Sequence, residues 1–484
     1  MTTRKEIANA LMQGAASLRD TLNVVNYKDY VLPIVFFKYL EEASFQKLFE
    51  QRDNENLGQL INTALRKIED DNPHQLAGVF SIVDYDSDTY LGNRERRNTI
   101  LRELLKNFVN LDLRPSQIEV QEKQSPADVI SDVINEFVSN AGKRDGFFCT
   151  PMAVMEIIAS IVNVQNGEKV YDPACGSGSL LIRVAKWQDK NQISIYGQEI
   201  NRSLASLAKI NMFIHRIDDA HVAWGNTLAN PLFLDSKGNL KLFDVVVADI
   251  PFSLSNWAAD FNPGGEVAGK SRKEFKLEAP MDKYHRFDWG VPPASKGDWA
   301  FLLHMIASCA PQGRIAAVTP HGVLFRSGAE KIIRKQIIDE NLLDAVIGLP
   351  ENTFFGTGVS VCILLFKKDR KNKNVVFIDA SKKDDTGKPR YVKGKNQNIL
   401  EEKNINDIVQ AYQKRKNIAR FVHVAALKEI TDNDYNLHIP HYVDTFEEEK
   451  IINIEEVRRN IRRLKAEIIR AETKMDGYLK ELEL

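Results

Sequence analysis

Between Gly146 and Lys368, short runs of β-branched residues alternate with stretches of helical periodicity. The runs include GEKVYDPA, ISIYGQEI, FDVVVADI and GRIAAVTP, and the helical stretches include SLLIRVAKW, SLASLAKINMFIH and DWAFLLHMIASCA. Nearly continuous Val and Ile indicate strands that are buried on both faces, which requires helices on both sides of a sheet. The alternation therefore predicts an α/β domain with a parallel, doubly wound sheet over residues 141–370.

The regions on either side of this domain have a different pattern. A chain of 484 residues is long enough for several cores. Residues 1–140 read as a helical domain, because Leu11, Ala15, Leu18 and Leu22 recur at helical spacing and the apolar segment Tyr27–Leu40 follows them. Residues 371–445 are more polar and read as a mixed extension.

The last segment, residues 446–484, carries an unbroken heptad pattern. The first apolar row is Ile454, Ile461, Ile468, Met475 and Leu482, and the second is Val457, Leu464, Ala471 and Tyr478. About four consecutive heptads predict a coiled-coil helix, with Arg and Glu at the other positions. We expect this helix to dock on a partner, and the alternative is a helix that packs back on its own domain.

Net charge and cysteine spacing limit the possible functions. A protein that binds DNA alone usually has a basic excess, whereas this chain has a net charge of −1. If the substrate is DNA, a partner must supply much of the binding. Four separate cysteines without a C-x-x-C pair predict neither zinc nor a disulfide framework, which fits a reducing cytoplasm. The sequence predicts neither a signal peptide nor a membrane span.

A glycine loop, Asp172–Gly178, lies between a predicted buried strand and a helix. Glycines there permit a tight turn and a close approach of the backbone to a ligand. The next predicted strand ends at Glu199, whose carboxylate can accept both hydroxyls of a ribose. Asp172 ahead of the turn would repel the pyrophosphate of a dinucleotide but suits the ammonium of a methionyl group.

The segment Gly146–Pro151 precedes another predicted helix. Thr150 is a good N-cap and Pro151 a good first helical residue. These preferences leave the aromatic pair Phe147 and Phe148 unexplained, and such a pair is suited to wall a cofactor pocket.

The tetrapeptide Asp249–Phe252 directly follows the strand Phe243–Ala248, where ligands bind in open α/β sheets. An exocyclic amine on a purine is a poor nucleophile because its lone pair is delocalised into the ring. The Asp249 carboxylate and the Ile250 carbonyl, held by Pro251, offer two acceptors for its two N–H groups. Phe252 offers a face for stacking an extruded base. The tetrapeptide thus favours methyl transfer to an amino nitrogen by positioning and electrostatics, without a metal.

In these segments the chain resembles the γ-class N6-adenine DNA methyltransferases, and more closely the modification subunits of type I restriction–modification systems. That family has a G-x-[FY]-[FY]-T-P-like segment, a D-P-A-C-G-S-G loop and an acidic strand end, which Gly146–Pro151, Asp172–Gly178 and Glu199 match. Gly225–Leu228 matches a G-[DN]-T-L element near the adenine ring. The resemblance covers most of the chain, although residues 47–126 and 370–429 match loosely.

The resemblance implies a Rossmann-like S-adenosylmethionine-dependent methyltransferase domain that methylates a flipped adenine in double-stranded DNA. The family tetrapeptide is usually N-P-P-[FY], so Asp249 and Ile250 depart from it, but both preserve an acceptor. Asp249, Ile250, Pro251 and Phe252 are the implied catalytic residues. The implied cofactor-binding residues are Phe147, Phe148, Cys149, Thr150, Pro151, Met152, Asp172, Ala174, Gly176, Ser177, Gly178, Ser179, Glu199, Asn226 and Thr227.

The resemblance also implies partners. A separate specificity subunit reads the DNA and carries coiled-coil helices, on which residues 446–484 would dock. A second copy of the chain belongs to the complex, and a restriction and translocase subunit can join it. Lys270, Arg272, Lys273 and Lys276, in the long insert from Ser253 to Lys296, either clamp DNA phosphates or belong to a solvated loop.

Three other functions compete with this interpretation. A protein glutamine methyltransferase uses a related tetrapeptide but does not need the helical domain or the heptads. A Rossmann dehydrogenase is disfavoured because the loop lacks the third glycine, which lets the helix pack closely in that fold. A catalytically silent assembly subunit would explain the altered tetrapeptide.

Overall fold

The computed structural model describes residues 1–19, 27–122, 124–141, 150–187, 192–261, 276–354, 358–384, 387–395, 397–443 and 454–481. Phe147, Phe148, Cys149, Lys270, Arg272 and Lys273 lie outside these residues. Met1–Val443 forms one compact unit and Asp444–Leu484 a second, which contains helix α16 (Ile454–Glu481). Among the described helices, none has both the length and the hydropathy needed to cross a membrane.

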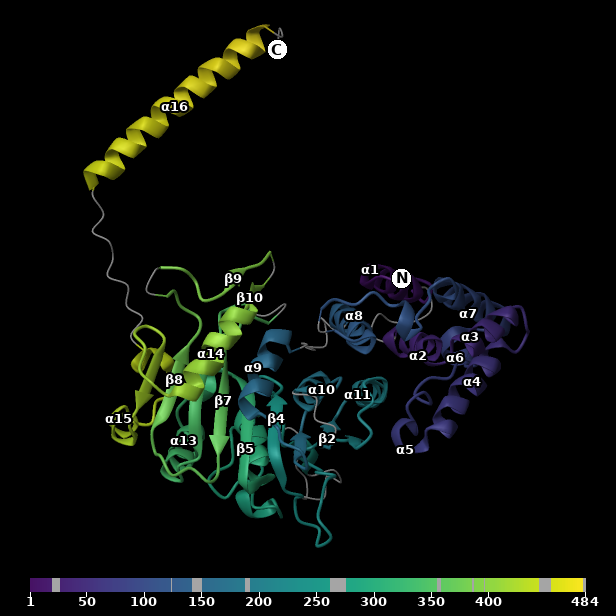
Figure 1. Ribbon diagram of the computed structural model, residues 1–484, viewed down its shortest axis with the longest axis horizontal. Coiled ribbons are helices and arrows are strands. Elements are labelled where there is room, and N and C mark those ends of the chain that lie inside the picture. The colour runs from purple at the N-terminus through teal and green to yellow at the C-terminus, as the bar shows by residue number, and fades with distance from the viewer. Residues whose placement is uncertain are drawn as a thin grey trace. The chain divides into compact units, whose positions relative to one another are not determined.

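Nine strands of the described residues form one sheet in the order β11-β8-β6-β7-β5-β4-β1-β2-β3 (Figure 1). The strands are β1 (Lys169–Asp172), β2 (Ser194–Glu199), β3 (Ala220–Trp224), β4 (Phe243–Asp249), β5 (Cys309–Pro320), β6 (Leu343–Gly348), β7 (Val361–Lys367), β8 (Val375–Asp379) and β11 (Val422–Ala425). A two-stranded sheet pairs β9 (Val392–Lys393) with β10 (Asn398–Ile399). The predicted α/β class is confirmed.

The predicted parallel pairing does not hold for two strands of the sheet, β7 and β11. Strands β1 to β5 pair in parallel, as do β6 and β8. Strand β7 is antiparallel to both β5 and β6, and β11 is antiparallel to β8. A parallel return requires a crossover connection, usually a helix, and the described residues between β6 and β7 contain no helix. The chain therefore turns back on itself and β7 runs in reverse.

Helices cover both faces of the sheet, as the buried strands require. Apolar residues of one face pack with α9 (Met152–Val162), α10 (Ser179–Lys186) and α14 (Glu402–Lys414). Those of the other face pack with α12 (Asp298–Ala307), α13 (Ala329–Asp339) and α15 (Leu427–Asp432). Every residue of β6 is buried, which explains its apolar run Ala345–Ile347.

The N-terminal region is helical, as predicted. Its helices are α1 (Arg4–Ala16), α2 (Tyr27–Leu40), α3 (Glu42–Glu50), α4 (Leu57–Asp71), α5 (Pro73–Leu76), α6 (Asp88–Leu91), α7 (Arg94–Val109) and α8 (Pro126–Ala141). They share a hydrophobic core with α11 (Arg202–Ile214), which follows β2. This shared core joins the helical region to the sheet domain. The predicted boundaries at residues 140, 370 and 445 stay predictions.

Strand order defines where a ligand is expected. From β1 the chain continues to β2 and β3 on one side, and then returns to β4 on the other side of β1. The order thus reverses between β1 and β4, and such a switch point opens a crevice beyond the carboxyl ends of the two strands. Asp172 and Asp249 are the last residues of these strands.

Candidate active site

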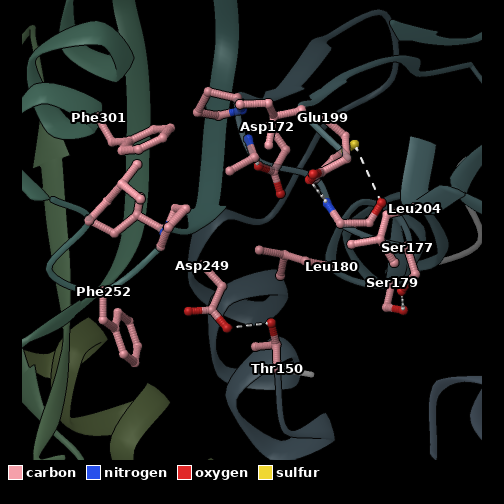
Figure 2. Close-up of a pocket in the computed structure, with 18 of the residues that line it drawn as sticks. Thr150, Asp172, Ser177, Ser179, Leu180, Glu199, Leu204, Asp249, Phe252 and Phe301 are labelled. Carbon is pink, nitrogen blue, oxygen red and sulfur yellow. Dashed lines mark hydrogen bonds between the residues drawn. The ribbon is translucent and has the colours of Figure 1, made fainter. Parts of the chain in front are cut away.

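A cavity of about 1150 Å³ lies beyond the carboxyl ends of β1, β2 and β4. Figure 2 shows Asp172, Glu199 and Asp249 around it, with Phe252 on the side away from Glu199. The predicted site residues that line it are Thr150, Pro151, Met152, Asp172, Ala174, Gly176, Ser177, Ser179, Glu199, Asn226, Thr227, Asp249, Ile250, Pro251 and Phe252. The fold thus brings together residues that span about one hundred positions of the sequence.

The glycine loop makes the tight turn that its sequence predicts. Gly176 has φ of 54° and Gly178 has φ of 81°, where residues with a side chain are strained. A Cβ on Gly178 would lie 2.9 Å from Cε of Met212. Gly178 is the N-cap of α10 and does not line the cavity, so it supports the loop by close packing instead of contacting a ligand.

Two buried carboxylates flank the loop. Oδ1 of Asp172 accepts the backbone N–H of Ala174 at 2.8 Å. Oε2 of Glu199 accepts the N–H of Gly176 at 2.9 Å, and Oε1 accepts the N–H of Asn201 at 2.8 Å. Burial raises the pKa of Glu199. Burial, reinforced by the negative charges of Glu199 and Asp249, raises the pKa of Asp172 well above its usual range.

The catalytic carboxylate predicted from the tetrapeptide, Asp249, is half-buried at the end of β4. Thr150 donates its hydroxyl to Oδ2 of Asp249 at 2.7 Å. Burial raises the pKa of Asp249 to about 7, although the Thr150 hydrogen bond opposes the shift. The interpretation of Thr150 as a helix cap is wrong, because α9 begins at Met152, Pro151 is its N-cap, and the Thr150 hydroxyl bonds the carboxylate instead.

The rest of the tetrapeptide is fixed by packing. The Ile250 side chain is buried in the core beneath the sheet's edge. The Phe252 ring is half-buried and meets the ring of Phe354 edge-on, with centroids 5.8 Å apart. This contact leaves part of the Phe252 side chain facing the cavity.

Asp298, which the sequence analysis did not single out, holds the backbone that follows the tetrapeptide. Its Oδ1 accepts the N–H of Ser253 at 2.7 Å, and its Oδ2 accepts Nη1 of Arg326 at 2.9 Å. Ser253 has φ of 53°, an uncommon conformation that this bond stabilises. The sequence signal for Asp298 was a charged residue at the start of the largely apolar helix DWAFLLHMIA. Such a helix is expected to be buried, and a buried charge needs specific partners.

The predicted Asn226–Thr227 element lines the cavity through a braced turn. Thr227 donates its hydroxyl to the Pro173 carbonyl at 2.6 Å. Oδ1 of Asn226 accepts the backbone N–H of Leu228 at 3.1 Å. Nη2 of the buried Arg286 donates to the Leu228 carbonyl at 2.7 Å. The glycine loop and this turn are therefore one connected structure.

Helix α8 of the helical region reaches the glycine loop, which the sequence analysis missed. Ser177 donates its hydroxyl to Oδ1 of Asn135 at 2.9 Å, and Nδ2 of Asn135 donates to Oγ of Ser179 at 3.0 Å. Asn135, Asp132 and Glu136 line the same cavity. The helical region thus forms one wall of the site.

The reversed β7, the glycine loop and the acidic strand ends define a methyltransferase of the Rossmann-like class. The family model for N-6 DNA methylase matches residues 124–451, and the model for the HsdM N-terminal domain matches residues 41–108. The chain belongs to the N-6 DNA methylase family, in the branch of the type I restriction enzyme methylase subunits. The predicted family and the predicted reaction, adenine-specific DNA methylation, are confirmed.

Individual relatives agree over most of the chain. The type I restriction enzyme MpnII methylase subunit of Mycoplasma pneumoniae is 33% identical over 85% of this chain and 75% of its own length. The MjaVIII methylase subunit of Methanocaldococcus jannaschii is 29% identical over 99% of this chain and 85% of its own. The crystal structure of a type I restriction-modification methyltransferase subunit from Streptococcus thermophilus aligns with a TM-score of 0.69 and 28% identity, covering 92% of this chain and 100% of that chain.

Proposed function

We propose that the cavity binds S-adenosylmethionine and that Asp249 and the Ile250 carbonyl hold the N6 amino group of an adenine flipped out of duplex DNA. The observation that carries this proposal is the convergence of Asp172, Glu199 and Asp249, from three neighbouring strands, on one cavity. A single carboxylate would fit many ligands. Three of them beside a glycine loop favour a nucleoside that also carries positive charge.

The charges of the cavity suit this cofactor. Asp172 and Glu199 are buried and Asp249 is half-buried, and the negative charges of Glu199 and Asp249 add to the rise in the pKa of Asp172. The ammonium and the sulfonium of S-adenosylmethionine would offset this repulsion, since opposite charges favour the ionised carboxylate. A dinucleotide, with its pyrophosphate, would add to the repulsion instead.

Each part of the cofactor has residues suited to hold it. We assign the ammonium to Asp172, the ribose hydroxyls to Glu199 and the adenine edge to Asn226 and Thr227. When bound, the sulfonium supplies an activated methyl group. The role of Ser177 and Ser179 is to fix the loop, since their hydroxyls are bonded to Asn135.

On the substrate side, Asp249 and Ile250 form a pair of acceptors. Thr150 occupies Oδ2 of Asp249, and in the described part of the chain no donor is bonded to Oδ1. Oδ1 and the Ile250 carbonyl can then accept one N–H each from the adenine, which frees the nitrogen lone pair for attack. Phe252, braced by Phe354, supplies the stacking face.

Helix α16 is assigned to subunit assembly. Its apolar positions Val457, Ile461, Leu464, Ile468 and Met475 are all more than 40% exposed. A heptad seam of this kind fits the coiled coil of a DNA-reading specificity subunit. A complex with that subunit, a second copy of this chain and, in some assemblies, a restriction subunit explains how a chain with net charge −1 acts on DNA in the cytoplasm.

Methyl transfer by the chain, reconstituted with its DNA-reading specificity subunit, tests the proposal. Labelled methyl groups should enter DNA, and digestion to nucleosides should yield N6-methyladenine. Bound cofactor without incorporation would identify a silent assembly subunit. Label in protein instead of DNA would identify a glutamine methyltransferase.

A further inference from the structure

A basic segment lies close to the cavity in the structure. Residues 381–400 contain six basic residues, Lys382, Lys383, Lys388, Arg390, Lys393 and Lys395, against the two acidic residues Asp384 and Asp385. The whole chain has a net charge of −1, so this is a local excess. The segment includes β9 and β10, which pair as an antiparallel hairpin.

The hairpin is attached to the loop that follows β6. The backbone N–H of Asn398 donates to the Asn352 carbonyl at 2.9 Å, and its Nδ2 donates to the Glu351 carbonyl at 2.6 Å. Lys393 is the register partner of Asn398 across the hairpin. The neighbouring residue Gln397 lines the cavity that contains Asp249. The hairpin is thus part of the rim of the site.

The same loop reaches the tetrapeptide. Phe354, two residues after Asn352, meets Phe252 edge-on at 5.8 Å. Gly394 donates its N–H to the Gln397 carbonyl at 2.9 Å and closes the hairpin turn, which contains Lys395. Lys395 therefore lies two residues from Gln397, which lines the cavity, and a lysine side chain is long enough to reach the rim from there.

Four of the basic side chains are available for a ligand. Lys382, Lys388, Lys393 and Lys395 are exposed, and within the described residues none of them forms an ion pair. Arg390 is different, because its guanidinium lies 3.9 Å from the ring centre of Phe421 and serves packing. Lys393 and Lys395 belong to the hairpin, and Lys382 and Lys388 to the segment that leads from β8 into it. We call these four residues the rim lysines.

We propose that the rim lysines bind the phosphates of duplex DNA on the side of the target adenine. This inference rests on the proposed function and adds a DNA-contacting surface to it. A cavity lined by three carboxylates repels a polyanion, and positive charge at its mouth would favour the approach of the duplex. Lysines that contact only phosphates would orient the duplex without reading its sequence.

The test compares DNA binding by the full chain, assembled with its DNA-reading subunit, before and after all four rim lysines are changed to Gln. Fluorescence anisotropy with a duplex is recorded between 50 and 200 mM salt. Each lost phosphate contact should reduce the slope of log affinity against log salt by about 0.9, and four contacts by about 3.6. The affinity for a duplex that contains the target sequence and the affinity for an unrelated duplex should fall by the same factor.

A matched control removes the same charge from the opposite edge of the sheet. Lys371 and Lys373 precede β8. Lys414 ends α14 and Lys416 follows it, on either side of Arg415, which pairs with Asp344 in β6. All four are exposed. Their change to Gln should leave the slope within about 0.9 of the native value.

Two results would overturn the inference. One is a rim-lysine variant whose salt slope equals that of the control variant. The other is a rim-lysine variant that no longer forms the complex on gel filtration, which would show that these lysines bind an acidic surface of the partner subunit instead of DNA. In contrast, failure of the proposed function would appear as methyl transfer that survives Asp249→Ala, whatever the salt slope.

Discussion

Thr150 and Asp249, which are 99 positions apart in the sequence, are joined by a hydrogen bond of 2.7 Å from the Thr150 hydroxyl to Oδ2 of Asp249. The bond fixes one oxygen of a buried carboxylate and leaves the other for the substrate. It also opposes the rise in pKa that burial causes. The segment before α9 and the end of β4 therefore act on the same group.

The pKa of Asp249 predicts a pH dependence. Burial raises it to about 7, so acidification protonates the carboxyl and turns an acceptor into a donor. The ratio kcat/KM, which reports the ligand-free protein, should rise through pH 7 and at pH 6 should be roughly a tenth of its plateau. Asp249→Asn, which restores the residue usual in the family, should remain active and lose this titration. A pH profile of the Asn variant that still rises through 7 would assign the titration to another group.

Thr150→Val should lower kcat. A hydrogen bond to a charged group contributes about 1.5–3 kcal/mol, so the loss should be roughly 10-fold to 100-fold. The pKa of Asp249 should also rise, because the bond lowers it, and the midpoint of the pH profile should move upward. Thr150→Ser, which keeps the hydroxyl, is the control. Weaker cofactor binding with an unmoved midpoint would show instead that Thr150 serves the cofactor.

Asn135→Ala should weaken cofactor binding. It removes two hydrogen bonds to the glycine loop, each of which contributes about 0.5–1.5 kcal/mol. Calorimetry should give a dissociation constant raised roughly 5-fold to 100-fold, with little change in kcat at saturating cofactor. The control is Asn107→Ala on α7, where the amide donates to the Glu103 carbonyl of its own helix. Equal affinities for the two variants would contradict a role for α8 in the site.

The carboxylates of the site could be predicted from the sequence because strand ends are easy to locate. Asp172, Glu199 and Asp249 each end an apolar run, and the carboxyl ends of parallel strands share one edge. Asn135 could not be placed in this way, because nothing in a helix sequence states which distant loop its polar residues meet. Asp128, Ser131, Asp132 and Ser139 lie at helical spacing from Asn135 and form a polar stripe on α8, but a helix face exposed to solvent has the same pattern.

Strand direction was the part of the fold that the sequence analysis got wrong. The run Val361–Lys367 predicts a buried strand but not its direction, because a parallel and an antiparallel buried strand have the same apolar composition. Only the connection decides, and the one before β7 lacks a helix in its described residues. A helix-free connection predicts an antiparallel return.

Changing Ile461 and Leu464 to Glu should abolish assembly with the specificity subunit. Both are exposed on α16 and occupy the two core rows of the heptad, where a charge is not tolerated in a coiled coil. Cofactor binding should be unchanged. Arg459→Glu with Ala466→Glu, on the opposite heptad position, is the control. A complex of native size on gel filtration would reject the docking role.

The central claim is that the Asp249 carboxylate holds the adenine amino group during transfer. The most direct measurement is incorporation of labelled methyl groups into DNA by the assembled complex, with native chain and with Asp249→Ala. Loss of one preorganised acceptor should lower kcat by about 10²–10³, while cofactor affinity and the salt dependence of DNA binding stay native. Transfer by the Ala variant at the native rate would contradict the account.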